Sequence, residues 1–205
     1  MRYLLVISFI IFSIGCSKAP YSNLLKSDAD KLCIVKFKPQ FNAILYNAKI
    51  DVVGKHLSGL LLFKTMPDSS IRVVFSNEMG VKFFDFEYTN SSFKSIYCIR
   101  QLNKKIVIRQ LKEDIGYLFM YNINLSSASV NQNNNQLYFE FDGKKTKTYY
   151  ITDANCSKLL RIENASKRKK KIIIDLSNYK SGMADSVNIA HQLFQFNINL
   201  KQIDR

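Results

Sequence analysis

The chain has 205 residues, 47% of them hydrophobic and 13% aromatic, a composition that excludes an intrinsically disordered protein. Lys and Arg outnumber Asp and Glu by 30 to 16, so the formal net charge is +14 and anionic partners are favoured. The two histidines and four cysteines lack the paired spacing of a zinc site, which excludes that class of metal protein.

The first twenty residues, MRYLLVISFIIFSIGCSKAP, have the pattern of a secretory leader. Arg2 precedes an apolar run from Tyr3 to Ile14 that is too short to span a bilayer of about 30 Å. Residues 13–16, Ser-Ile-Gly-Cys, resemble the bacterial lipobox, in which cleavage before the cysteine leaves that cysteine acylated. We therefore expect residues 1–15 to be a lipoprotein signal peptide and Cys16 to carry the lipid. The alternative is an ordinary cleaved leader in which Cys16 is incidental.

Residues 16–40 are expected to form a tether and a short helical element that ends at Pro39. The helical spacing is that of Leu24, Leu25, Ala29 and Leu32 or Cys33. Three widely spaced cysteines remain after Cys16, so at most one disulfide forms, and the spacing does not say which pair it joins. They are Cys33, Cys98 and Cys156.

From residue 41 the patterns are those of strands separated by short turns. The first five runs are AILYNAKIDVV, HLSGLLLFK, SIRVVFS, VKFFDFEY and FKSIYCIR. Connections this short cannot contain crossover helices, so neighbouring strands are expected to pair antiparallel.

An amphipathic helix is expected over residues 102–119, where apolar residues recur every three to five positions and Asn103 caps the start. After a polar stretch, two hairpins are predicted, LYFEFDG with KTKTYYIT and KLLRIE with KIIIDL. The run VNIAHQLFQFNINLKQI is predicted to be one long strand with a bulge or bend between Leu193 and Phe194.

About ten strands with one or two helices must curl rather than stay flat. The predicted fold is therefore mainly β: a strongly curved antiparallel sheet, or incomplete β-barrel, with one or two helices covering its concave side.

The segments LSGLLLFK and SIRVVFSNEMGVKFFDFEY, together with the short helix and the late hairpins, resemble the LolA/LolB fold of periplasmic lipoprotein carriers and outer-membrane lipoprotein receptors. More narrowly, they resemble small outer-membrane lipoproteins of Bacteroidetes-type bacteria. The resemblance implies a single half-barrel domain over residues 41–205 that holds acyl chains in a hydrophobic cavity, with the helix as a lid. It also implies that Met79 and Gly80 form a membrane-contact loop, whereas the alternative is that Met79 folds back over the core.

The apolar faces of the strands and the helix provide seven candidate residues for the cavity. They are Phe63, Phe83, Phe84, Phe86, Leu111, Ile115 and Phe196. A basic run in a predicted hairpin turn is a candidate contact for anionic headgroups, or else a solvated turn that discourages edge pairing. Its residues are Lys167, Arg168, Lys169, Lys170 and Lys171.

No catalytic arrangement is recognisable. Asp85 and Glu87 share one strand face, whereas glycosidase carboxyls stand on opposite sides of the substrate. His56 and His191 belong to no triad pattern. We therefore expect a non-enzyme without cofactor or metal, and no nucleic-acid partner, because no binding motif accompanies the basic residues.

The expected function is that of a lipid-anchored lipoprotein at the periplasmic face of the outer membrane. It would bind acyl chains and receive or insert lipoproteins or lipids. The expected partners are the membrane, acyl chains, and a periplasmic carrier or an envelope complex. The alternative is a structural or accessory lipoprotein that docks to an envelope complex.

Overall fold

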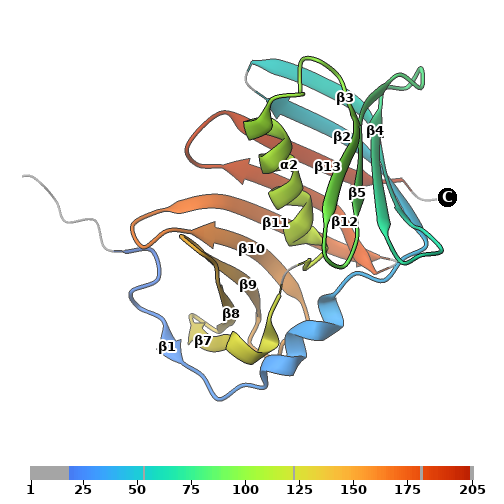
Figure 1. Cartoon of the computed structure of the whole chain (residues 1–205). Helices are drawn as coiled ribbons and strands as arrows, with labels where there is room; N and C mark the ends of the chain where they lie inside the picture. The colour runs from blue at the N-terminus through green and yellow to red at the C-terminus, as the bar shows by residue number, and fades with distance from the viewer. Residues whose placement is uncertain (1–18, 53, 122, 181, 204–205) are drawn as a thin grey trace, which may run out of the picture.

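The computed structural model describes residues 19–203, except positions 53, 122 and 181 (Figure 1). The predicted leader, residues 1–15, and the predicted lipidation site, Cys16, lie outside the described residues.

The described residues form thirteen strands, one α-helix and two 3-10 helices. In chain order these are β1 (Leu25–Lys26), η1 (Lys31–Phe37), β2 (Ala43–Val52), β3 (Lys55–Thr65), β4 (Ile71–Ser76), β5 (Lys82–Tyr88), β6 (Phe93–Cys98), α2 (Lys105–Leu118), η2 (Leu125–Ser127), β7 (Ser129–Asn133), β8 (Gln136–Asp142), β9 (Lys147–Asp153), β10 (Leu159–Ala165), β11 (Lys170–Lys180), β12 (Met183–His191) and β13 (Phe196–Gln202).

All thirteen strands belong to one sheet, in the order β1-β7-β8-β9-β10-β11-β12-β13-β2-β3-β4-β5-β6. Every neighbouring pair is antiparallel. Strands β1 and β6 are its two edges, so the sheet is not closed into a barrel. Figure 1 shows the sheet curving around α2. The prediction of a mainly β, antiparallel and open architecture is confirmed.

Strand β2 shows why these segments fold as they do. It buries alternate residues, from Ile44 and Tyr46 to Val52, because successive side chains point to opposite faces. Helix α2 follows its own period and buries Val107, Leu111 and Ile115 on one stripe. Its N-cap is Lys104, which makes no side-chain cap hydrogen bond, so the predicted cap at Asn103 is wrong.

The segment predicted as one long final strand is two strands. Strands β12 and β13 pair antiparallel, with Val187 opposite Leu200, and residues 192–195 form the turn between them. The change of apolar phase at Leu193–Phe194 therefore marks a hairpin and not a bulge. The expected number of about ten strands was low for this reason and because the polar residues of β7 gave no apolar alternation. Strand β1 was also not expected, since Leu25 belongs to the predicted helical spacing.

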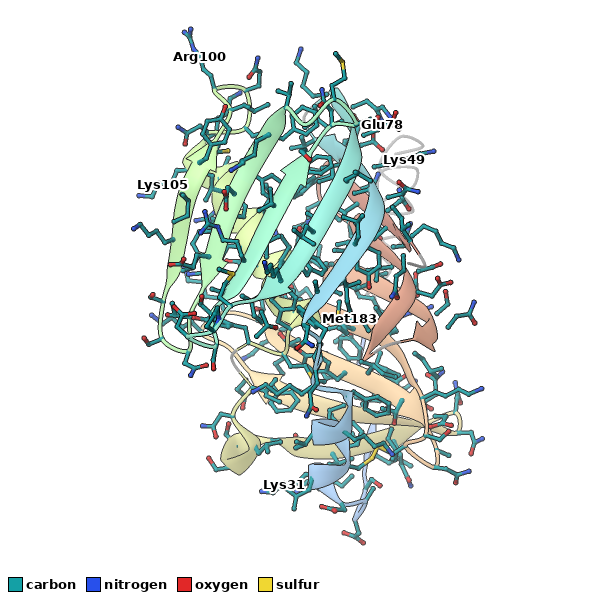
Figure 2. The ribbon with its side chains drawn as sticks, turned by 90° about the vertical axis from the view of Figure 1, so that its right-hand side faces the viewer. Lys31, Lys49, Glu78, Arg100, Lys105 and Met183 are labelled. Carbon is teal, nitrogen blue, oxygen red and sulfur yellow. A yellow bond between two sulfur atoms is a disulfide. The ribbon has the colours of Figure 1, made fainter. Side chains whose placement is uncertain are left out.

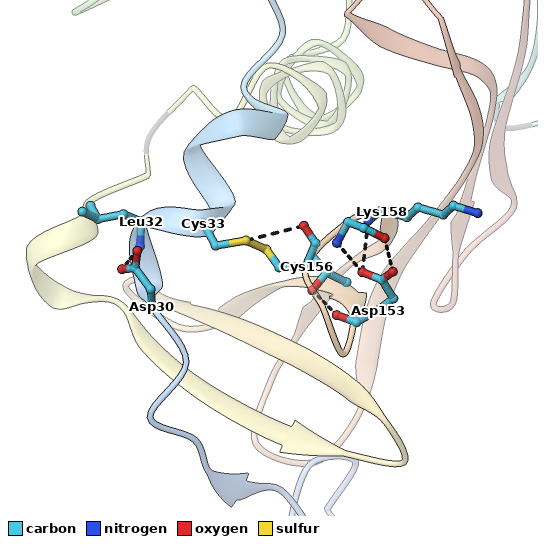
Figure 3. Close-up of a disulfide and its surroundings, with 8 residues drawn as sticks. Asp30, Leu32, Cys33, Asp153, Cys156 and Lys158 are labelled. Carbon is cyan, nitrogen blue, oxygen red and sulfur yellow. Dashed lines mark hydrogen bonds between the residues drawn. A yellow bond between two sulfur atoms is a disulfide. The ribbon is translucent and has the colours of Figure 1, made fainter.

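The N-terminal part of the described chain lies against the outer side of the sheet. The Tyr21 ring stacks on Tyr149 with their centroids 3.9 Å apart, and the Tyr21 hydroxyl donates to Glu163. Tyr149, Ile151 and Ala165 form a second, small hydrophobic cluster under Tyr21. The chain then reaches η1, a 3-10 helix whose N-cap Asp30 accepts from Leu32 N at 2.8 Å (Figure 3).

Candidate functional site

Helix α2 packs on one half of the inner face of the sheet. Six of the seven predicted cavity residues are at most 2% exposed and belong to the main hydrophobic core there: Phe63, Phe84, Phe86, Leu111, Ile115 and Phe196. The Phe63 ring lies 5.1 Å from that of Phe119, just after α2, and Phe84 stacks on Phe86 at 4.4 Å. These side chains fill the space under the helix with one another. The seventh, Phe83, is half-buried, 4.9 Å from Phe75.

The other side of α2 faces a cleft of about 410 Å³ between the helix and strands β8, β9 and β10. Its lining combines aromatic, small polar and charged side chains: Lys112, Glu113, Gly116, Tyr117, Tyr121, Ile123, Phe141, Asp142, Gly143, Lys144, Thr146, Thr148, Tyr150 and Asn164. None of the predicted cavity residues is among them. This cleft could not be predicted from the sequence, because its residues come from a helix face and hairpins whose inward direction depends on tertiary packing.

Three side-chain interactions hold α2 on the sheet. The Tyr88 hydroxyl on β5 donates to Lys112 O at 3.0 Å, and the Tyr150 hydroxyl on β9 donates to Tyr117 O at 3.1 Å. Between them, the Asp114 carboxylate lies 2.9 Å from Nε2 of His191 on β12. The helix is thus attached to β9, which lines the cleft, and to β5 and β12.

The Asp114–His191 pair is buried, with Asp114 fully inaccessible. Gln110 donates a further hydrogen bond of 3.1 Å to Asp114. Burial raises the pKa of Asp114 above its usual value, although the hydrogen bonds from His191 and Gln110 act in the opposite direction. Sequence reasoning treated His191 as a lone strand residue. The signal that it missed was Asp114 itself, a carboxylate on the apolar stripe of a helix.

Three more buried carboxylates, Asp85, Glu163 and Asp185, lie away from the cleft, and each is paired with a cation, Asp185 with Lys201. Asp85 is bound by Arg72 and Lys82, whose hydrogen bonds outweigh the effect of burial and hold its pKa below the usual value. Glu163 is bound by Arg161 and Lys170. Asp85 and Glu87, which share one strand face, therefore both take part in ion pairs, since Glu87 also lies 3.7 Å from Arg72.

Several hairpin turns lie side by side at one end of the strands. Asp142 pairs with Lys147, and Lys147 with Ala165, which places the β8–β9 turn beside the β10–β11 turn. The β12–β13 turn follows, because Gln192 N donates to Lys171 O at 2.8 Å. We call these three turns, residues 143–146, 166–169 and 192–195, the basic rim. Most of the predicted headgroup contacts belong to it: Lys167, Arg168 and Lys169 are exposed at its centre.

The last two residues of the predicted basic run behave differently. Lys170 reaches back to Glu163 at 2.8 Å, and its ammonium lies 5.5 Å from the centre of the Tyr21 ring. Lys171 is half-buried in β11. Lys170 therefore helps to hold the sheet and the N-terminal segment together.

The Met79 turn, between β4 and β5, lies at the same end of the strands but further along the sheet. Strand β13 begins beside the end of β2, with Phe196 opposite Val52, and β3 starts beside it at Lys55. Strand β4 ends at Ser76 opposite Leu60, so the β4–β5 turn begins further back along β3. Figure 2 shows Glu78 at one end of the molecule and Lys31 at the other. Met79 is 89% exposed, so it does not fold back over the core. Gly59 lies at the base of this turn, where a Cβ would collide with the carbonyl oxygen of Ser76.

Residues 19–203, with their three gaps, hold no cluster of three or more His, Cys, Asp or Glu side chains suited to a metal ion. No helix in the described part of the chain combines the length and hydropathy needed to cross a membrane.

No protein-family model matches the chain, and no curated protein matches it. Among solved structures, a DUF1329 family protein from Desulfovibrio piger has 10% identity and a TM-score of 0.47, over 85% of this chain and 90% of the other. A LolA superfamily protein from Nitrosomonas europaea has 9% identity and a TM-score of 0.49, over 85% and 89%. A domain named for outer membrane lipoprotein sorting, from Vibrio parahaemolyticus, has 12% identity and a TM-score of 0.43, over 82% and 86%. Likenesses at this level transfer neither residue roles nor activity from one chain to another.

Proposed function

We propose that the protein is a non-enzymatic, lipid-anchored envelope protein that binds an acyl chain and acts in lipoprotein or lipid sorting at the outer membrane. The observation that carries the proposal is the cleft of about 410 Å³ between α2 and strands β8–β10. Its volume falls within the roughly 300–1,000 Å³ typical of ligand pockets. The resemblance of the sequence to the LolA/LolB fold supports the choice of an acyl chain as the ligand.

The lining of the cleft suits an amphiphile with an anionic head. Tyr117, Phe141 and Tyr150 offer apolar ring surface, whereas Lys112 and Lys144 supply positive charge. Each methylene transferred from water to an apolar site contributes about 0.8 kcal/mol. Eight buried methylenes would therefore contribute roughly 6 kcal/mol before the cost of ordering the ligand.

In this proposal α2 is the lid. The predicted cavity residues, such as Phe63 and Leu111, lie beneath it and form the wall that a longer chain would reach when the helix moves. The hydrogen bonds from Tyr88 and Tyr150 and the Asp114–His191 pair are the interactions that such a movement breaks.

The proposal also includes two points of contact with the membrane. Cys16 carries the anchor, and the exposed Met79, beside Gly80, contacts the bilayer. A second candidate function, an accessory lipoprotein that docks to an envelope complex, is favoured by one observation: the core beneath α2 is filled by its own side chains.

Gly116 provides the test, because it lies in the wall of the cleft and a Cβ added there has only Tyr121 Cβ within 4 Å, at 3.9 Å. Gly116→Phe should fill the cleft, whereas Gly116→Ala adds only a Cβ and favours the helix by up to about 1 kcal/mol. The two variants and the parent protein are purified without detergent and examined by native mass spectrometry and lipid extraction.

We expect acyl species to accompany the parent protein and Gly116→Ala, and to be lost from Gly116→Phe at unchanged melting temperature. Parent protein that remains free of lipid after incubation with phospholipids and lipopeptides would contradict acyl binding and favour the accessory role. Equal lipid content in all three proteins would contradict the assignment of the cleft.

A further inference from the structure

The basic rim carries cationic side chains that the fold does not use. Five exposed residues on its turns form no ion pair within the described part of the chain: Lys144, Lys145, Lys167, Arg168 and Lys169. The neighbouring Lys147, by contrast, is neutralised by Glu140 and Asp142. Five unpaired cations on two adjacent turns create a local field that attracts anions.

The third turn of the rim adds apolar side chains to this charge. Leu193 and Phe194 are 50% and 46% exposed at its tip. The hydrogen bond from Gln192 N to Lys171 O fixes this tip directly beside the basic β10–β11 turn. An apolar tip flanked by lysines matches the boundary between acyl chains and anionic headgroups. A nucleic acid offers the phosphates but no apolar layer for Leu193.

The start of the described chain lies on the same rim. Ala19 and Ser22 line one groove together with Lys144, Lys145 and Lys167. Position 16 is three residues before Ala19, and a fully extended chain covers at most about 3.6 Å per residue. A lipid on Cys16 would therefore hold Ala19 within about 11 Å of the bilayer, with the basic rim beside it.

From these three observations we infer that the basic rim is a docking surface for a phospholipid bilayer that contains anionic headgroups. Leu193 and Phe194 enter the headgroup layer, and the cations of the β8–β9 and β10–β11 turns bind phosphates on both sides. The Met79 turn lies further along the sheet, and the inference does not depend on it. The inference does not require a ligand in the cleft, and it holds or fails independently of acyl binding.

Vesicle binding tests the charge. The protein used is residues 19–205, which contains every described element and keeps the Tyr21 contacts but has no leader or lipid. Phosphatidylcholine vesicles with and without phosphatidylglycerol are sedimented with the parent, with Lys167→Gln/Arg168→Gln/Lys169→Gln, and with the control Lys31→Gln/Lys36→Gln/Lys38→Gln. Both triple variants lose three positive charges, but the control residues lie on and beside η1, which Figure 1 shows well apart from the turn between β10 and β11.

We expect the parent to bind the anionic vesicles, the rim variant to bind on the order of 100-fold more weakly, and the control to stay close to the parent. Equal losses in both variants would reduce the effect to net charge and overturn the inference. Absence of vesicle binding by the parent, or equal binding to vesicles without phosphatidylglycerol, would also overturn it.

The position of the contact is tested by fluorescence, because the chain contains no tryptophan. Leu193→Trp introduces a reporter at the rim, and Leu32→Trp introduces one on η1, where the side chain is 58% exposed. On binding, the emission of Leu193→Trp should shift to shorter wavelength and be quenched by lipids brominated on their acyl chains. Leu32→Trp should show neither change. The reverse pattern would place the contact elsewhere and contradict the inference.

Discussion

At the scale of single residues, the Asp114–His191 pair is one of the interactions that link α2 to the sheet. Both side chains are almost wholly removed from solvent, and their polar atoms lie 2.9 Å apart. The His191 ring also stacks against Phe196 at 4.8 Å and lies 4.9 Å from Phe194. A change of charge at Asp114 therefore alters contacts of both α2 and the β12–β13 turn.

The pH dependence of stability tests this pair. Because the folded pKa of Asp114 lies above the value near 3.9 of an unfolded Asp, the folded state binds this proton more tightly. Its contribution to the free energy of unfolding is full below about pH 4 and is lost as pH rises through the folded pKa. Asp114→Asn has no such loss, so its stability should rise relative to the parent between about pH 4 and pH 7.

Urea unfolding at several pH values measures this difference, with the exposed Asp28→Asn as the control. A difference between Asp114→Asn and the parent that stays constant with pH, or that falls as pH rises, would contradict the assignment.

At the scale of elements, alternation and turn chemistry predicted most of the sheet. Strands β2 to β6 and the two central hairpins were expected because each carries a buried face and ends at a turn residue. Strand β7 was missed since Asn131 and Gln132 carry no apolar signal and are placed by pairing with Tyr138 and Leu137. The cleft could not be predicted for a related reason, because the half of the sheet that α2 covers is decided by tertiary packing.

The disulfide is another feature that the spacing of cysteines left open. Cys33 on η1 is joined to Cys156, between β9 and β10, with their Cα atoms 6.5 Å apart (Figure 3). Asp153 organises this turn by accepting from Lys158 N at 3.0 Å. Cys98 is free, and burial raises the pKa of its thiol to about 11, so it stays protonated at neutral pH.

Removing the bridge should loosen the N-terminal element from the sheet. The sequence separation is 123 residues, and cross-links of natural proteins typically contribute about 2–4 kcal/mol. We expect Cys33→Ala/Cys156→Ala to lower the free energy of unfolding by that amount, and reductant to have the same effect on the parent. Cys98→Ala is the control and should leave the response to reductant unchanged. A parent protein indifferent to reductant would show that the bridge does not stabilise the fold.

At the scale of the whole molecule, three features lie at the same end of the strands: the start of the described chain, the basic rim and the Met79 turn. Hairpin connections between antiparallel neighbours alternate between the two ends of the strands, so every second turn returns to the same end. The N-terminal segment reaches this end because Tyr21 fastens it to Tyr149 and Glu163. If Cys16 carries the proposed lipid, Tyr21 determines how far the rim can lie from it.

The last prediction concerns removal of the Tyr21 contacts with Tyr149 and Glu163. In Tyr21→Ala the chain is next held at Leu24, which packs on the same small cluster eight residues after position 16, so the reach from the anchor to the first held residue grows from about 18 Å to about 29 Å. On protein anchored in membranes, trypsin should then cleave at Lys167–Lys169 several-fold faster than in the parent, because the rim is no longer kept at the bilayer. Tyr97→Ala, an exposed change on β6, should behave as the parent.

In detergent, where no bilayer protects the rim, the three proteins should be cleaved at equal rates, which separates loss of docking from local unfolding. Equal cleavage on membranes would show that the Tyr21 contacts do not position the rim, whereas parent protein absent from the membrane fraction would refute the anchor at Cys16.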